Sequence, residues 1–177
     1  LRDEIPQVVA AAPWASKRLP VKFGGSSATT NVMGVTPAGQ DILNISIYAG
    51  SFYTEREEIT AGRTAVLGTT GFRALFGDER PVGRRLLIGN VPFEVLGVLR
   101  PRGTDLSGAD QDDVVVIPLR TALRRVLNQD WLGGIYLRAR SDAEMEEAAE
   151  QIRWLLRERH RLDRTNDDDD FEIQTQA

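Results

Sequence analysis

The sequence predicts an α+β fold in which strands and helices follow one another in irregular order. Short apolar runs bounded by glycine or proline recur from Arg18 to Arg140, which is typical of strands joined by tight turns. One long amphipathic segment at residues 141–160 predicts a helix near the end of the chain. The regular alternation of a βαβ barrel or a doubly wound sheet is absent, so two small layers or subdomains suit the pattern better.

Glycine separates a strand from a short helix at the start of the middle region. The run RTAVLG at residues 63–68 predicts a buried strand. The following TTGFRALFG, residues 69–77, predicts a helix that Thr69 or Thr70 caps and that Gly77 ends. One face of this helix is apolar and carries Phe72, Leu75 and Phe76.

A hairpin, a loop and another strand follow. Residues 84–88 and 91–99 predict two strands, because Gly89–Asn90 tolerates the positive φ of a tight turn. Residues 100–113 are rich in Gly, Asp and Ser and lack periodicity, which predicts an exposed loop. The run VVVIPL at residues 114–119 predicts a strand that its proline ends or places at a sheet edge.

The clearest element is the helix at residues 141–160. Ser141 and Glu144 have the spacing of a capping box, and acidic residues crowd its first turns while arginines crowd its last. A shorter helix at residues 120–128 and a strand at residues 135–140 precede it. The buried stripe of the long helix is predicted to contain Met145, Ala148, Ala149, Ile152, Leu155 and Leu156.

The first 60 residues have a weaker pattern. Residues 18–25 and 29–35 predict two strands separated by a polar turn, and Pro37 is placed to start a short helix. Residues 45–53 fit either a strand or an extended loop. The glycine- and β-rich residues 57–119 are the best candidate for a separate lobe.

Composition narrows the class of protein. The net charge of −4 gives no field that would attract nucleic acid, although a local basic patch such as Arg84–Arg85 remains. Cysteine is absent, which removes disulfides, thiolate metal sites and a cysteine nucleophile. No window approaches the roughly 18 consecutive apolar residues of a membrane-spanning helix. The sequence therefore predicts a soluble domain, and the first residue, Leu1, suggests an excised piece of a longer protein.

Four consecutive aspartates, Asp167 to Asp170, raise the question of a metal site. Neither possible frame places glycine and glutamate where a calcium loop of the EF-hand type requires them. Consecutive carboxylates also point in diverging directions. A solvated acidic turn is the expectation, with weak surface calcium binding as the alternative. His160, the single histidine, is expected to interact with the carbonyls at the end of the long helix rather than to bind zinc.

Catalytic patterns are also absent. The run GGSSA at residues 24–28 is not a nucleophile elbow, and Glu94 is expected to point outward from its strand. The run GTTGFRALFG at residues 68–77 lacks the lysine and hydroxyl of a phosphate-binding loop. We therefore predict no catalytic, cofactor-binding or metal-binding residue and no enzymatic activity.

Six sequence segments follow one another along almost the whole chain. They are VMGVTP (32–37), AGSFYTEREE (49–58), TAVLGTTGFRALFG (64–77), PVGRRLLIGNVPFEVLGVL (81–99), DDVVVIPL (112–119) and IRWLLRERH followed by DDDDFEI (152–160 and 167–173). This series closely resembles the periplasmic core domain of MacB-type permeases of ABC transporters. The resemblance implies a porter-like α/β subdomain of residues 1–56 plus 120–177, with residues 57–119 inserted as a small, mainly β subdomain.

The resemblance also implies a function. In that family the domain lies between the first and second transmembrane helices of a permease, on the periplasmic face of the inner membrane. It passes movements driven by a cytoplasmic ATPase to the exported substrate, or to lipoprotein release, in what is called mechanotransmission. The implied partners are the permease's own transmembrane helices, the ATPase domain or subunit, a second permease protomer and a periplasmic adaptor protein. Phe171 to Ala177 would form a final strand leading to the second membrane helix.

Two alternative functions remain open from the sequence. The alternative function is that of a stand-alone secreted or cell-surface domain that captures a ligand, and a third reading is a hydrolase that uses buried carboxylates. The loop from Gly103 to Asp113 is a surface candidate for contact with an adaptor or substrate, because it is long and polar.

Overall fold

The computed structural model describes residues 3–105, 107–162 and 168–175. The chain divides into two compact units. The larger unit contains residues 12–136, and the smaller contains residues 1–11 together with 137–177. Each unit has its own apolar core, and the mixture of strands and helices confirms the predicted α+β class.

Six strands of the larger unit form a closed ring. In ring order the neighbours are β1, β2, β7, β4, β6 and β5, and β5 pairs with β1 again. The pairs β2–β7 and β4–β6 are parallel and the other four are antiparallel, which gives a mixed, barrel-like sheet. The strands are β1 (Val8–Phe23), β2 (Ser26–Val35), β4 (Thr64–Leu67), β5 (Arg85–Ile88), β6 (Val91–Leu99) and β7 (Val114–Pro118).

Two further strands pair with members of this ring. The strand β3 (Ile47–Gly50) pairs with β6 in the antiparallel direction. The strand β8 (Gly134–Ala139) pairs with β1. The pairing of β5 with β6 confirms the hairpin predicted around Gly89, where φ is 60°. The pairing of β1 with β2 confirms the two strands predicted within residues 18–35.

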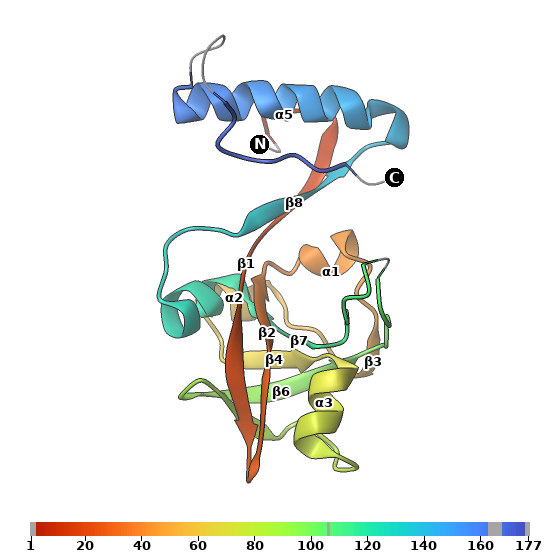
Figure 1. The fold of residues 1–177 in the computed structure, drawn as a ribbon, viewed down its shortest axis with the longest axis vertical. Coiled ribbons are helices and arrows are strands. Elements are labelled where there is room, and N and C mark those ends of the chain that lie inside the picture. The colour runs from red at the N-terminus through yellow and green to blue at the C-terminus, as the bar shows by residue number, and fades with distance from the viewer. Residues whose placement is uncertain (1–2, 106, 163–167, 176–177) are drawn as a thin grey trace. The chain divides into compact units, whose positions relative to one another are not determined.

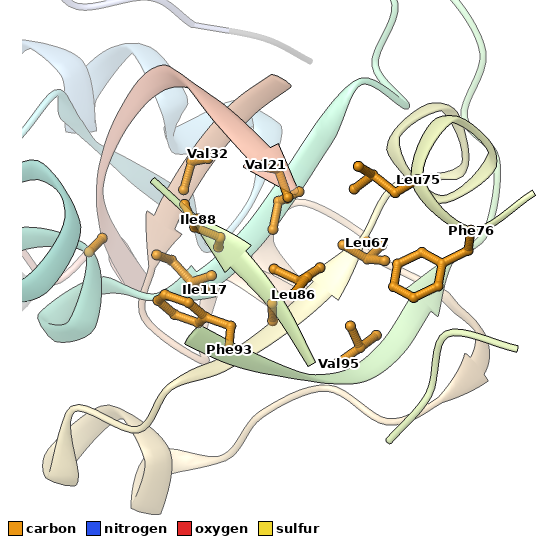
Figure 2. Close-up of a cluster of buried hydrophobic side chains, with 13 residues drawn as sticks. Val21, Val32, Leu67, Leu75, Phe76, Leu86, Ile88, Phe93, Val95 and Ile117 are labelled. Carbon is orange, nitrogen blue, oxygen red and sulfur yellow. The ribbon is translucent and has the colours of Figure 1, made fainter. Parts of the chain in front are cut away.

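Apolar side chains from all six strands fill the interior of the ring (Figure 2). Because side chains alternate across a strand, Ala65 and Leu67 point inward while Val66 belongs to a second core on the other face. The first core also contains Ala122 and, from helix α3 (Thr69–Phe76), Leu75 and Phe76, which pack against the ring. The strand residues of this core are Val21, Val32, Ala65, Leu67, Leu86, Ile88, Phe93, Val95, Val115 and Ile117.

The second core covers the outer face of β4 and β7. Helix α1 (Gly39–Ile42) and strand β3 lie in the segment that supplies it. The buried Tyr53 places its hydroxyl 2.7 Å from the carbonyl oxygen of Val35 and 2.9 Å from that of Ile117. These two carbonyls lie at the C-terminal ends of the parallel strands β2 and β7, so the Tyr53 hydroxyl links the two strands there.

Two helices differ from the sequence-based expectation. Helix α3 begins and ends as predicted, but neither Thr69 nor Thr70 caps it, because Gly68 is the capping residue and makes no side-chain bond. Helix α2 (Glu55–Thr60) was not predicted, although Thr54 and Glu57 form a complete capping box at its start.

The predicted helix after Pro118 is also present in an unusual form. Helix α4 (Leu119–Thr121) continues directly into a π-helical segment, Ala122–Leu127, which ends at Asn128 in the left-handed conformation. Pro118 ends β7 but does not lie at a sheet edge, since β7 is flanked by β2 and β4.

The smaller unit is built on helix α5 (Met145–His160). Its core contains Ile5, Val8 and Ile152, with Leu137, Leu155, Leu156 and Ile173 packed against them. The predicted apolar stripe of the helix is therefore confirmed. The predicted capping box is not, because Ser141 makes no side-chain cap bond and a 3-10 turn, Asp142–Glu144, precedes the helix.

The end of the chain also differs from the expectation. Phe171 to Thr175 form no strand, although the resemblance implied one for Phe171 to Ala177, of which the last two residues lie outside the described part. Side-chain contacts hold this segment instead, since Ile173 packs on the core of the smaller unit.

The division into two units groups the residues differently from the predicted subdomains. The predicted boundaries near residues 57 and 119 both fall within the larger unit, which spans residues 12–136. The reason is the pairing of strands from either side of those boundaries, such as β2 with β7 and β1 with β5. In the larger unit of Figure 1, these strands belong to the same sheet.

Candidate functional site

The loop from Gly103 to Asp113 is exposed along most of its length and is organised by its own carboxylates. At its base, the buried Asp112 accepts hydrogen bonds from the backbone N–H groups of Arg102 at 2.8 Å and Gly103 at 3.0 Å. Residues 104 and 110 form an antiparallel bridge. The loop therefore has a defined hairpin-like shape rather than the irregular course that its composition suggested; Leu106 lies outside the described residues.

Two more carboxylates fix the tip and the side of this loop. Asp105 Oδ1 accepts bonds from the N–H of Ser107 at 2.8 Å and of Ala109 at 3.0 Å, besides the Ser107 hydroxyl. Asp110 Oδ2 accepts a bond from the Thr70 hydroxyl at 2.7 Å, which ties the loop to α3. The Ser107 and Thr70 bonds are the main reasons that the pKa values of Asp105 and Asp110 lie below their usual range.

Close backbone packing explains the glycine that precedes α3. A Cβ atom on Gly68 would lie 2.2 Å from the carbonyl oxygen of Asp112, so only glycine allows the base of the loop to approach this closely. The N–H of Thr70 donates to the same carbonyl at 3.2 Å. Gly68 thus serves the close packing of the loop base on the start of α3.

Glu58 is a buried carboxylate that no sequence pattern indicated. Only 9% of this residue is exposed; its Oε1 accepts a bond from the N–H of Arg120 at 3.1 Å, while Oε2 is buried without a hydrogen-bond partner among the described residues. Burial raises the pKa of Glu58. Its neighbour Tyr53 has a raised pKa as well, first because of burial and then because of the charge of Glu58. No apolar run surrounds Glu58 in the sequence, so its burial follows from tertiary packing.

An apolar surface patch lies on the segment before and within β8. Trp131, Leu132 and Ile135 are exposed, and 64% of Trp131 is accessible. The glycines between them are needed for packing, because a Cβ atom on Gly133 would lie 2.4 Å from the ring of Trp14. Three exposed large apolar side chains thus lie within five residues, a feature that periodicity alone did not reveal.

The C-terminal acids contact the long helix. His160 is the last residue of α5, as predicted, and its Nδ1 lies 2.6 Å from Asp170 Oδ1. Asp169 forms ion pairs with Arg153 and Arg157. Asp167 lies outside the described residues. Within residues 3–105, 107–162 and 168–175 no group of three or more His, Cys, Asp or Glu side chains is arranged to hold a metal ion.

The other residues considered for chemistry lie in ordinary positions. Glu94 is exposed on β6, as expected, and its register partners are Arg85 on β5 and Thr64 on β4. Gly24 and Gly25 of the run GGSSA form the turn between β1 and β2, with a φ of 55° at Gly24, and the rest of the run begins β2. Across the described part of the chain, no helix has the length and apolar character needed to cross a membrane.

The family model of the MacB-like periplasmic core domain matches residues 1–155. The chain belongs to this family. The MacB-like relatives include the macrolide export ATP-binding/permease protein MacB of Wolinella succinogenes, which is 31% identical over 157 residues covering 89% of this chain. MacB of Chlorobium phaeobacteroides is 36% identical over 86% of the chain, and the pyoverdine export ATP-binding/permease protein PvdT of Pseudomonas entomophila is 32% identical over 93%.

Two solved structures of transporter domains have the same fold. The extracellular domain of the ABC-type transporter YknZ superposes with a TM-score of 0.77 at 16% identity, covering 88% of this chain and 78% of that domain. The periplasmic region of MacB from Actinobacillus actinomycetemcomitans gives a TM-score of 0.75 at 22% identity, covering 87% and 68%. The chain spans only about a quarter of the curated relatives, for example 24% of the Wolinella and 26% of the Pseudomonas protein. The match concerns the periplasmic core domain and not their ATP-binding part.

Proposed function

We propose that this chain is the extracytoplasmic domain of an ABC export permease and that it couples cytoplasmic ATP hydrolysis to export by mechanotransmission. The observation that carries the proposal is the match of the periplasmic core domain family to residues 1–155. The relatives are named as ATP-binding/permease proteins, and their remaining length would supply the membrane-spanning and ATP-binding parts. The chain itself would then be a mechanical component and not an enzyme.

This domain does not need to recognise the exported substrate. One relative is named for macrolide export and another for pyoverdine export, which are chemically different cargoes. The identity to both is similar, at 31% and 32%. A shared domain that transmits movement accounts for this similarity more simply than a pocket fitted to one cargo.

The loop from Gly103 to Asp113 is our candidate for the contact with an adaptor protein or with cargo. It is exposed and polar, and its shape is fixed by Asp105, Asp110 and Asp112, so little conformational entropy would be lost when a partner binds. The partners proposed for the whole protein are its own transmembrane helices, the ATPase, a second permease protomer and an adaptor.

The finer architecture is also part of this proposal. Residues 1–56 with 120–177 would correspond to the porter-like subdomain and residues 57–119 to the inserted β subdomain. The β-rich ring strands β4, β5, β6 and β7 within residues 57–119 support the second half of this correspondence. Limited proteolysis of the chain tests it: cleavage near residues 57 and 119 that releases a stable fragment would support an independent inserted unit.

The parent reading frame gives the first test of the function. An extracytoplasmic permease domain requires apolar spans of about 20 residues both before and after the region of this chain. A gene with a cleavable secretion signal and no later span would overturn the proposal in favour of a stand-alone ligand-binding domain.

The second test concerns coupling in the parent permease in membrane vesicles. Replacing residues 103–113 by a short glycine–serine turn should abolish cargo export while ATP hydrolysis persists. Loss of neither activity would contradict the proposed contact loop, and an export defect with normal adaptor cross-linking would assign the loop to cargo instead.

A further inference from the structure

The smaller unit holds the beginning of the chain against the end of helix α5. Glu4 forms an ion pair with Arg159. Arg140 adds two bonds to the same N-terminal segment: its backbone N–H donates to the Gln7 carbonyl at 2.8 Å and its guanidinium to the Pro6 carbonyl at 2.7 Å. The N-terminal segment is therefore attached to this unit by both backbone and side-chain contacts.

The end of the chain is attached to the same half of α5 by Asp169. Its carboxylate lies 3.2 Å from Arg153 and also pairs with Arg157. These arginines are four residues apart, so they are neighbours on one helix face, and Asp169 pairs with both of them. Arg157 and Asp169 have side-chain exposures of only 20% and 26%, and solvent screens such a pair less than a fully exposed one.

Two contacts with His160 continue the attachment beyond Asp169. Asp170 lies beside the His160 ring, and Phe171 meets that ring edge-on with 5.8 Å between the ring centroids. Ile173 then packs against the core that contains Ile5 and Ile152. The segment thus has an ionic part and an apolar part, and it has no strand pairing within residues 168–175 to hold it.

We propose that the C-terminal half of α5 is a releasable clamp for the two ends of the domain, and that Asp169 is the residue that closes it. This inference rests on the proposed function, in which both ends continue into membrane-spanning helices. With the clamp closed, a displacement of either end is passed to the other through α5. With Asp169 released, the C-terminal segment moves independently of the helix.

The chemistry of the clamp suits a reversible contact. Ion pairs that solvent partly reaches are individually weak and are screened by salt. A strand pairing would exchange several backbone bonds and would open less readily. The clamp therefore opens without unfolding of the ring in the larger unit, whose core is separate.

The test on this chain uses chymotrypsin cleavage after Phe171, identified by mass spectrometry. Cleavage requires the segment to leave the helix, so its rate reports the population of the open clamp. We expect Asp169→Asn to raise the rate about threefold to tenfold, as loss of two partly exposed ion pairs should. Asp168→Asn is the matched control, since it removes the same charge from a neighbour for which the structure shows no ion pair among the described residues.

A salt series on the unmodified chain gives the same information without a variant. Raising NaCl from about 0.05 M to about 0.5 M should accelerate cleavage after Phe171 in the unmodified chain and have little effect on Asp169→Asn. Equal cleavage rates for the Asp169 and Asp168 variants, or a rate independent of salt, would overturn the clamp.

The parent permease separates this inference from the proposed function. Asp169→Asn should reduce export relative to Asp168→Asn while ATP hydrolysis continues. If cleavage shows release but export is unchanged, the role of the clamp in coupling is wrong and the proposed function stands. If the parent has no flanking membrane spans, the proposed function fails, whereas the cleavage result still decides whether Asp169 closes a clamp.

Discussion

Gly34 on β2 faces Ala122 at the start of the π-helical segment with no room for a side chain between them. A Cβ atom on residue 34 would lie 2.2 Å from the Ala122 Cβ and 3.2 Å from the Leu119 Cα. The helix that follows β7 therefore packs directly on the backbone of β2. This contact fixes the helix on the ring at a distance that only glycine permits.

Gly34→Ala should destabilise the larger unit. The added methyl group forces the helix away from β2, and overpacking of this kind costs about 1–3 kcal/mol. Gly71→Ala is the control, because the space around that helical residue is open and alanine favours the helix by about 1 kcal/mol. Thermal unfolding should show the two variants shifting in opposite directions, and a neutral Gly34→Ala would mean that the helix is free to move.

Tyr53→Phe should weaken the junction of β2 and β7. The Tyr53 hydroxyl donates its one proton to the buried carbonyl oxygens of Val35 and Ile117. Removal of the hydroxyl takes this donor away from both oxygens. We expect a loss of about 1–2 kcal/mol in the free energy of unfolding, measured by urea denaturation. Tyr48→Phe provides the comparison, since 67% of Tyr48 is exposed and the same chemical change there should have almost no effect.

Glu58→Gln should stabilise the protein at neutral pH. The pKa of Glu58 is raised in the folded state, so its contribution to stability is present below the unfolded pKa near 4.5 and is lost as the pH rises through the folded value. Glutamine keeps the oxygen that accepts from Arg120 and removes the buried charge. The variant should exceed the unmodified chain by about 1 kcal/mol at pH 7, with the difference shrinking toward pH 4.

Glu57→Gln should show the opposite pH dependence of stability, because the pKa of Glu57 is shifted in the other direction. Its pKa is lowered, first by the bond from the Thr54 hydroxyl and then by the Thr54 N–H, so its stabilising contribution is present above the unfolded pKa and is lost as the pH falls. Substitution here should lower the melting temperature at pH 7 and have less effect in acid. Parallel pH profiles for the two variants would contradict the assignment of Glu58 as the buried group.

Asp112→Asn should loosen the base of the loop at residues 103–113. The carboxylate accepts bonds from two backbone N–H groups through its two oxygens, and an amide has one acceptor and would turn its NH₂ toward the other donor. Amide hydrogen exchange at Arg102 and Gly103 should accelerate about tenfold, equivalent to about 1.4 kcal/mol. Asp113→Asn, at a residue paired instead with Arg18, should leave those two amides unchanged.

The local elements were largely predictable, because their patterns depend on near neighbours. The hairpin at Gly89 and the amphipathic helix up to His160 follow from turn chemistry and periodicity. Capping patterns were less reliable. The Ser141 pattern forms no cap, because Glu144 lies in a 3-10 turn and pairs with Arg140 at 3.6 Å, whereas the same pattern at Thr54 does form one.

The closure of the ring and the buried Glu58 could not be predicted from such patterns. Ring closure depends on β2 pairing in parallel with β7, more than 70 residues later in the chain by the register of Asn31 with Val114. The burial of Glu58 depends on the N–H of Arg120, which helix α4, 62 residues later in the chain, brings to it. Both features arise from tertiary contacts that hydrophobic periodicity does not encode.

The two-sided pairing of β1 has a mechanical consequence. From Trp14 to Phe23 the strand is in register with β2, and at Val21 and Lys22 it also pairs with β5. A pull along the axis of β1 would load these hydrogen bonds together in shear, whereas a pull across the strand would break them one after another. We therefore expect β1 to resist a pull along its own length more strongly than a pull across it.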